Sequence, residues 1–553
     1  MDRAGEKGAL AVVVDDRPGV VGDTLASSVG AFGAFGAFGA VGVVGAVGED
    51  DASHHAARPG LGRWVRYTGW SLLGLQLLAM LAFSDTQYSR FALTNDFAEY
   101  SQAWSAIAHG NLNPYIGALG VPFWKNNGEF AMWPLALLFH IDPHPITLLW
   151  VQDLAAVATE AVAFTWIKKV IERAGERIPK GAGPLLAIGA AVVLVADPWV
   201  YETIAFDFHF EPIAAFFVVL VGYDLWSGRS RRVWLWVALA LLSTGLAGLL
   251  LVGVGISGVL AGSRTRRSGV LIAAAGAGWF LMLSVVGGIG LGGATLARSY
   301  GYLVGAHKGR IGPLDVIAGA LGHPSAVAHA IASNGVVVVS FLVVFGVIGV
   351  VTPWGLGMGL VVLVPVLLDE GGHLARYGAA FQSWPAMPFI LIGSIMVAVR
   401  LFQNGDSARR VAKVTLALWA SLLVSFAFVA LPGLPRAWLW ISPSAAAELA
   451  RIEPQIPADA EVVVSVPVMG RFAERDSVYG FVEDHQTVPV DRKVVVFVFS
   501  PYESFQKQLS RAGITAATGY VAHRLGARLL GARSGVSAFA WSPPVGTTRV
   551  TLP

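Results

Sequence analysis

The chain has 553 residues, of which 55% are hydrophobic and only 14% are charged. Because a soluble domain carries about a quarter charged residues, this composition excludes an ordinary soluble protein and predicts a polytopic membrane protein. The net charge of +3 comes from basic clusters between apolar stretches, so no nucleic-acid partner is expected. The chain contains no cysteine, which excludes disulfides, thiolate metal sites and a Cys nucleophile.

Residues 1–60 are rich in Gly, Ala and Val, and Gly-Ala-Phe recurs between residues 30 and 38. Such a tract lacks the bulky periodic residues that bury a core. Its start, which contains Asp2 and Glu6, is unlike the basic n-region of a secretory signal. We therefore predict a disordered, low-complexity N-terminus without an assigned function.

Residues 61–435 are predicted to form an all-α polytopic transmembrane domain. A crossing needs about 20 apolar residues. The stretch 233–260 has arginines near both ends, so it is predicted to be a hairpin that turns near Ser243-Thr244-Gly245. The eleven predicted crossings cover residues 64–83, 147–167, 184–200, 213–226, the two arms of 233–260, 270–291, 335–351, 354–368, 385–399 and 414–431.

Basic and acidic clusters fall at opposite ends of these stretches. Cytoplasmic loops carry an excess of Lys and Arg, which places five basic clusters inside: Arg63 with Arg66, and residues 168–180, 229–232, 264–267 and 400–413. The acidic and histidine clusters then lie outside. We expect a plasma-membrane protein with a cytoplasmic N-terminus and an extracytoplasmic C-terminus.

The outer loop 84–130 contains a helix-like piece, Phe97–Ala108. Phe97, Trp104 and Ile107 suit this piece to lying on the membrane surface. The next apolar stretch, 130–139, is too short to cross and is predicted to be re-entrant or interfacial.

Residues 442–553 are predicted to form a small extracytoplasmic α/β domain. Glu461–Val466 and Lys493–Phe499 are valine-rich runs that are typical of buried strands. Pro501-Tyr502-Glu503-Ser504 begins a helix-like segment. A structural cap over the membrane domain is the simplest role for this domain.

Two groups of side chains are candidates for chemistry. In the first, helical spacing places Glu99 and Gln102 on the face of Asp96, and the ring of Trp104 could hold a sugar. In the second, Asp207, His209 and Glu211 alternate with phenylalanines, and carboxylates with an imidazole suit a divalent cation. The alternatives are a solvated acidic loop for the first group, and helix capping with interfacial anchoring for the second.

A third predicted outer cluster runs from Asp369 to His373, and Arg376 follows it closely. Arg376 could bind a phosphate bidentately, and Lys125 adds a cation on the same predicted side. These residues are equally consistent with ordinary hydrated loop charges. The sequence contains no nucleophile elbow, Walker motif or Rossmann fingerprint.

Several segments resemble the predicted bacterial and archaeal membrane proteins that form domain of unknown function 2079. The resemblance runs from about residue 64 to the C-terminus, and its most specific part is Phe206-Asp-Phe-His-Phe-Glu-Pro212. The other matching segments are Asn95–Gly110, Pro122–Asn127, Met132–Leu138, Pro143–Asp153, Asp197–Trp199, Ile456–Val462 and Arg475–Phe481. Some members have Lys-Glu or Lys-Asp where this chain has Ser243-Thr244-Gly245.

That family is distantly similar to the GT-C membrane glycosyltransferases, which take a sugar from a polyprenyl-phosphate donor. The resemblance implies that Asp96 is the general base, with Glu99 as a second carboxylate. From the residue patterns described above, we predict a substrate site that includes Gln102, Trp104, Lys125, Asp207, His209, Glu211, His373 and Arg376. The rival interpretations are a lipid or solute transporter, and a non-enzymatic scaffold of the cell envelope.

Overall fold

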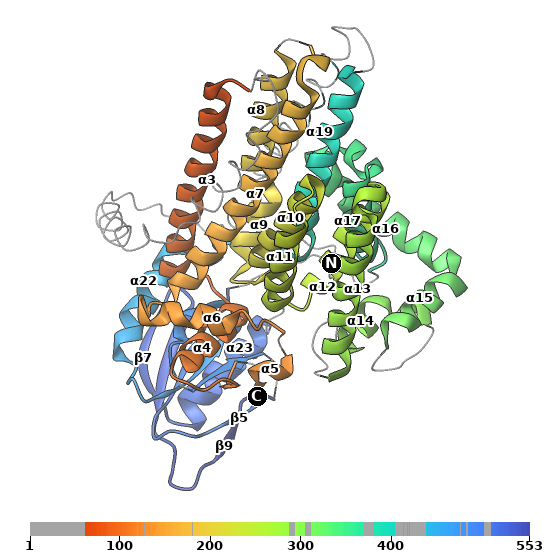
Figure 1. Ribbon diagram of the computed structural model, residues 1–553. Coiled ribbons are helices and arrows are strands. Elements are labelled where there is room, and N and C mark those ends of the chain that lie inside the picture. The colour runs from red at the N-terminus through yellow and green to blue at the C-terminus, as the bar shows by residue number, and fades with distance from the viewer. Residues whose placement is uncertain are drawn as a thin grey trace, which may run out of the picture. The chain divides into compact units, whose positions relative to one another are not determined.

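The computed structural model describes residues 61–118, 120–126, 128–179, 181–286, 293–304, 311–369, 380–403, 413, 417, 420, 438–475, 477–482, 485–502 and 510–553. The predicted low-complexity segment 1–60 and most of the predicted crossing 414–431 lie outside these residues. The described chain is mostly helical and carries a smaller sheet near its C-terminus (Figure 1).

Long apolar helices make up the first part of the described chain. The helices α3 (Arg63–Ser89), α7 (Ile146–Ala174) and α8 (Ala182–Val195) pack on one another (Figure 1). α9 (Pro198–Phe206) begins where Asp197 accepts a hydrogen bond from the Trp199 amide and Pro198 fixes the first turn. Next come α10 (Glu211–Ser227), α11 (Ser230–Ser243), α12 (Ala247–Leu260) and α13 (Ser263–Val286).

The predicted hairpin turn is confirmed, because α11 ends at Ser243 and α12 begins at Ala247. α12 then packs closely against α13. A Cβ atom added to Gly276 would overlap the carbonyl oxygen of Gly248, and one added to Gly255 would lie 2.6 Å from the Gly269 oxygen. Glycine at these positions lets the two backbones approach, as small residues do at helix contacts in membranes.

The remaining helices of this part are α14 (Gly293–Val304), α15 (Pro313–Gly322), α16 (Pro324–Phe345), α17 (Pro353–Leu367), α18 (Ala380–Ser383) and α19 (Met387–Gln403). Among the described residues, five helical segments are long and apolar enough to cross a membrane, or six if the pair bent by 102° at His323 is one span. Several other helices fall short of that length, so the predicted count of eleven crossings is not confirmed.

The segment between α3 and α7, which includes the predicted outer loop, contains short elements around one longer helix, α4 (Asn95–Ala108). The helix-like piece predicted there is confirmed. The expectation that its apolar face lies on the membrane surface is wrong, because Phe97, Trp104 and Ile107 pack into a protein core with residues that follow α4. The short elements are β1 (Tyr115–Ile116), β2 (Val121–Pro122), α5 (Phe123–Asn126), α6 (Met132–Leu135) and η1 (Ala136–His140).

The C-terminal part contains a five-stranded sheet with the order β4-β3-β6-β8-β7. The two predicted valine-rich strands are its fully buried centre, β3 (Glu461–Ser465) and β6 (Val495–Phe499), and they are parallel. Residues 503–509, which include most of the predicted helix-like segment, lie outside the described residues. The other elements are α22 (Pro443–Ile452), β4 (Val478–Phe481), β5 (Thr487–Pro489), α23 (Arg511–Gly519), β7 (Arg528–Arg533), β8 (Val536–Trp541) and β9 (Arg549–Thr551).

Candidate functional site

An unwound segment between α9 and α10 forms the centre of the candidate site. Asp207, Phe208 and His209 follow the end of α9 with no regular structure, and all three are buried. Buried backbone groups need partners, and the side chain of Gln152 in α7 provides two. Its amide group donates to the Asp207 carbonyl oxygen at 2.9 Å, and its oxygen accepts from the His209 amide at 2.5 Å. Gln152 thereby fixes the backbone that carries His209.

The imidazole of His209 lies between two carboxyl groups. His209 Nε2 is 3.6 Å from Asp96 Oδ2, and His209 Nδ1 is 3.8 Å from Glu211 Oε2. The ring of Phe381 stacks on the imidazole, with centroids 3.9 Å apart and planes inclined by 11°. Burial lowers the pKa of His209 to about 3, so the imidazole is neutral at physiological pH. The Asp96 side chain is 23% exposed against 8% for His209, which makes Asp96 the accessible member of the pair.

A third carboxyl group, that of Glu129, is linked to Glu211 through Thr244. The Thr244 hydroxyl donates toward Glu129 Oε1 at 3.4 Å and toward Glu211 Oε1 at 3.5 Å. Burial raises the pKa of Glu129 to about 8, and the negative charge of Glu211 adds to the effect. Glu129 therefore holds a proton at neutral pH. Thr244 lies in the turn of the α11–α12 hairpin, so the tip of this hairpin reaches the site.

The buried side chain of Asp207 links the unwound segment to α4. Its carboxylate accepts a hydrogen bond from the Thr94 amide at 3.0 Å and another from the Thr94 hydroxyl. Thr94 immediately precedes α4, so Asp207 ties the start of α4, and with it Asp96, to the unwound segment. Burial raises the pKa of Asp207, and the charge of Asp96 raises it further.

The other predicted site residues are more dispersed. Glu99 is buried in α4, where the ring of Tyr100 lies near the charges of Asp96, Glu99, Glu129 and Glu211. Gln102 accepts a hydrogen bond from the Ala118 amide. The fully buried Trp104 donates from its indole nitrogen to the Leu135 carbonyl oxygen at 2.9 Å. Lys125 is exposed in α5, while His373 and Arg376 lie outside the described residues.

The predicted divalent-ion site receives no support from the described residues. Within them, no group of three or more His, Asp or Glu side chains is arranged to hold a metal ion. The reason is geometric: Asp207 is turned toward Thr94, whereas His209 and Glu211 face each other. A metal ligand set of these three residues stays a prediction.

Four residues of the cluster were not predicted as site residues, namely Glu129, Gln152, Thr244 and Phe381. Glu129 is an acidic residue in the predicted outer loop, which is a weak signal. Gln152 is an amide inside a predicted apolar crossing, which is costly unless the amide has partners. Thr244 was predicted only as part of the hairpin turn, and nothing in the local sequence marks Phe381; both reach the site through the packing of distant helices.

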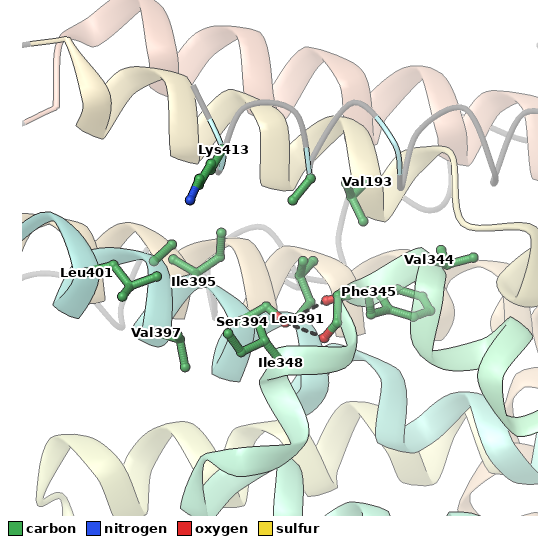
Figure 2. A pocket seen from close by; sticks show the side chains of 13 residues that line it. Val193, Val344, Phe345, Ile348, Leu391, Ser394, Ile395, Val397, Leu401 and Lys413 are labelled. Carbon is green, nitrogen blue, oxygen red and sulfur yellow. Dashed lines mark hydrogen bonds between the residues drawn. The ribbon is translucent and has the colours of Figure 1, made fainter. Parts of the chain in front are cut away.

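A separate apolar cavity of about 210 Å³ lies beside α19 (Figure 2). The Ser394 hydroxyl on its wall donates to the carbonyl oxygens of Phe345 and Gly346, each at 2.7 Å, and is thereby satisfied. Lys413 is the charged residue among its lining residues. The lining contains none of the carboxyl or imidazole groups of the His209 cluster, so the cavity is not part of the candidate site.

The apolar helices, with a buried cluster of ionisable groups at a break between two of them, define a polytopic membrane protein. Comparison with family models places it more closely. The chain belongs to the family described as "Predicted membrane protein (DUF2079)", whose model matches residues 92–518. This match confirms the family predicted from the sequence. A comparison with curated protein sequences finds no match.

Two solved structures of ArnT from Cupriavidus metallidurans are similar to the chain. The apo structure has 15% sequence identity and a TM-score of 0.45, and the structure bound to undecaprenyl phosphate has 12% identity and a TM-score of 0.43. Each alignment covers 86% of this chain and 98% of the ArnT chain.

Proposed function

We propose that the protein is a membrane glycosyltransferase that uses a polyprenyl-phosphate-linked sugar, with Asp96 as the general base. One observation carries this proposal: a partly exposed carboxylate lies 3.6 Å from a buried histidine, in a cluster that α4, the α9–α10 break and the α11–α12 turn build together. General bases need a carboxylate or imidazole that is accessible to substrate and held in place. Of the groups in the cluster, Asp96 fits best.

The proposed step is a single displacement at the sugar. The hydroxyl oxygen of the acceptor forms a bond to the anomeric carbon, while the bond from that carbon to the phosphate oxygen breaks. The electron pair of the broken bond leaves with the polyprenyl phosphate. The hydroxyl proton moves to the carboxylate of Asp96, which needs to lie within hydrogen-bond reach of that hydroxyl.

His209 acts on Asp96 rather than on substrate in this proposal. The neutral imidazole is held from the backbone by Gln152 and across its ring by Phe381. Its Nε2 lies 3.6 Å from Asp96 Oδ2, beyond hydrogen-bond distance, so it borders the Asp96 carboxylate without neutralising it and the carboxylate stays able to accept a proton. The leaving phosphate needs a cation, and Lys125 and Arg376 are the candidates that we propose for this role.

The direct test measures transfer of labelled sugar from polyprenyl-phosphate donors by the purified protein. Asp96→Asn should lower kcat by about 10²- to 10⁴-fold, the usual contribution of a general base. KM for the donor should change little, because the amide keeps the shape of the carboxylate. Asp459→Asn, at an exposed turn, is the matched control and should keep full activity.

Two results would count against the proposal. Full activity of Asp96→Asn would remove Asp96 as the base while leaving the reaction itself in place. Absence of transfer by the wild-type protein with every polyprenyl-phosphate donor offered would remove the glycosyltransferase function.

A further inference from the structure

Buried polar side chains lie on α3 and α7, two helices that pack on one another. They are Gln76, Ser84 and Gln87 on α3 and Gln152, Asp153 and Glu160 on α7, and each is at most 2% exposed. We call these six residues the polar seam. The spacings of 8 and 3 residues keep the set on α3 on one helix face, and the spacing of 7 does the same for Asp153 and Glu160 on α7. Gln152 is turned toward the unwound segment. Apolar packing would be expected between two spans, so this seam needs an explanation.

Glu160 is the inner end of the polar seam. It is the central residue of α7, fully buried, and neither of its carboxyl oxygens has a hydrogen-bond partner among the described residues. The amide of Gln76 faces it and interacts with it electrostatically, although neither polar atom of that amide forms a hydrogen bond of normal geometry with a described residue. A buried group left in this state marks a place for an additional ligand.

The neighbours of Glu160 do not neutralise it. Asp197 and Tyr201 are the titratable groups that act on it from α9, and α8 contains no titratable side chain. Asp197 is itself satisfied, since it accepts from the Trp199 amide and from the Trp384 indole, each at 2.9 Å. The remaining titratable side chains of α3, α10 and α19 lie toward the ends of those helices. No cation in the described residues pairs with Glu160, so a proton is the ligand that its charge requires.

From Glu160, the polar seam continues along α7 toward the His209 cluster, and it does not continue toward the C-terminal end of α7. Ser84 donates to Asp153 at 2.8 Å, Gln87 donates to the Ala205 carbonyl at 2.8 Å, and Gln152 bonds the unwound segment. From Gln152 to Glu160 the helix rises about 12 Å. Beyond Glu160, the buried side chains of α7 are apolar, and they include Phe164, Trp166 and Ile167.

We propose that Glu160 is an exchangeable proton-binding site inside the membrane domain, reached through the polar seam from the side of the His209 cluster. The ligand is a proton, and the polar side chains between Glu160 and the His209 cluster provide its route. The proposal stands independently of glycosyl transfer. It would also suit a proton-linked carrier, because a carrier needs an ionisable group within the spans.

The test uses dicyclohexylcarbodiimide, an apolar reagent that reacts with protonated buried carboxyl groups. The carboxyl proton moves to a carbodiimide nitrogen, the carboxylate oxygen bonds to the central carbon, and rearrangement leaves an N-acylurea that mass spectrometry can locate. The full-length wild-type protein is labelled in vesicles whose orientation is determined from protease access to residues 442–553. Glu172, which pairs with Lys169 at 3.7 Å on the same helix, is the internal control.

We expect the adduct on Glu160 and not on Glu172. Labelling of Glu160 should fall about tenfold or more as the pH is raised from 5 to 9 in the compartment that contains residues 442–553. It should not depend on the pH of the other compartment. The Glu160→Gln variant identifies the adduct peptide, but the conclusion depends only on the wild-type protein, so misfolding of the variant would not affect it.

Three outcomes would overturn the proposal. Absence of the adduct at every pH would mean that Glu160 carries no reactive proton. Labelling that is independent of pH, or that follows the opposite compartment, would remove exchange through the polar seam. A loss of labelling when sodium replaces choline at constant pH would show that a metal cation, rather than a proton, occupies the site.

Discussion

The buried carboxyl of Glu129 predicts an unusual dependence of stability on pH. Burial, reinforced by the charge of Glu211, raises its pKa from 4.5 to about 8. The folded protein therefore binds this proton more tightly than the unfolded chain does. The stabilisation is complete below pH 4.5, where both states are protonated, and is lost as the pH rises toward 8. Since each pH unit corresponds to about 1.4 kcal/mol, the loss at this one residue is at most roughly 5 kcal/mol.

Replacing Glu129 with Gln should remove that dependence. The amide resembles the protonated carboxyl in shape and can still accept the hydrogen bond from Thr244, but it never becomes charged. At pH 5 the variant and the wild-type protein should unfold at similar temperatures. At pH 9 the variant should be the more stable of the two, because the wild-type protein then either buries a charge or loses the native contact.

Thermal unfolding in detergent, followed by the fluorescence of the 18 tryptophans, measures this difference between pH 5 and pH 9. Glu176→Gln is the matched control, since Glu176 is exposed after α7, and its curve should follow that of the wild-type protein. A Glu129→Gln curve parallel to the wild-type curve, or one that lies below it at pH 9, would refute the reasoning.

Two further variants test the packing around the site. Gln152→Leu leaves the Asp207 carbonyl and the His209 amide buried without partners, which costs about 1–3 kcal/mol for each group. This variant should lower the unfolding temperature and any activity, whereas the control Gln455→Leu, at an exposed position, should change neither. An unchanged Gln152→Leu protein would show that these hydrogen bonds do not hold the unwound segment. Gly276→Ala should destabilise the protein by about 1–3 kcal/mol, because the added Cβ atom overlaps the Gly248 carbonyl oxygen. The control Gly278→Ala, whose added Cβ atom meets nothing within 4 Å, should be neutral or stabilising in the same melting assay. Equal effects of the two substitutions would contradict the close packing of α12 and α13.

Much of the fold could be predicted from local patterns. Long apolar runs predicted α3 and α7, and arginines flanking a 28-residue run predicted the hairpin. Two valine-rich runs predicted the centre of the sheet. The number of crossings could not be predicted in the same way, because helices such as α10 and α12, with 17 and 14 residues, are too short for length to decide.

The site was only partly predictable. Asp96 and His209 are 113 residues apart in the sequence, and each was a candidate because it is an ionisable residue beside apolar stretches. Their contact depends on Gln152 and Asp207, which hold the unwound segment against the start of α4. The apolar face of α4 illustrates the limit, since the same amphipathic pattern suits a membrane surface or a protein core. Tertiary packing decides between them.

The polar seam shows why averaging along a span conceals functional residues. The helix that contains α7 passes as a membrane span by its average composition, although Gln152, Asp153 and Glu160 are all buried within it. Apolar neighbours dilute each polar side chain in such an average, but the cost of burying a polar group does not average in this way. Each buried polar group must find its own partner or ligand. Gln152 and one carboxyl oxygen of Asp153 find theirs in the unwound segment and in Ser84, whereas neither oxygen of Glu160 does, and for that reason Glu160 is the residue of the polar seam that we propose as a site.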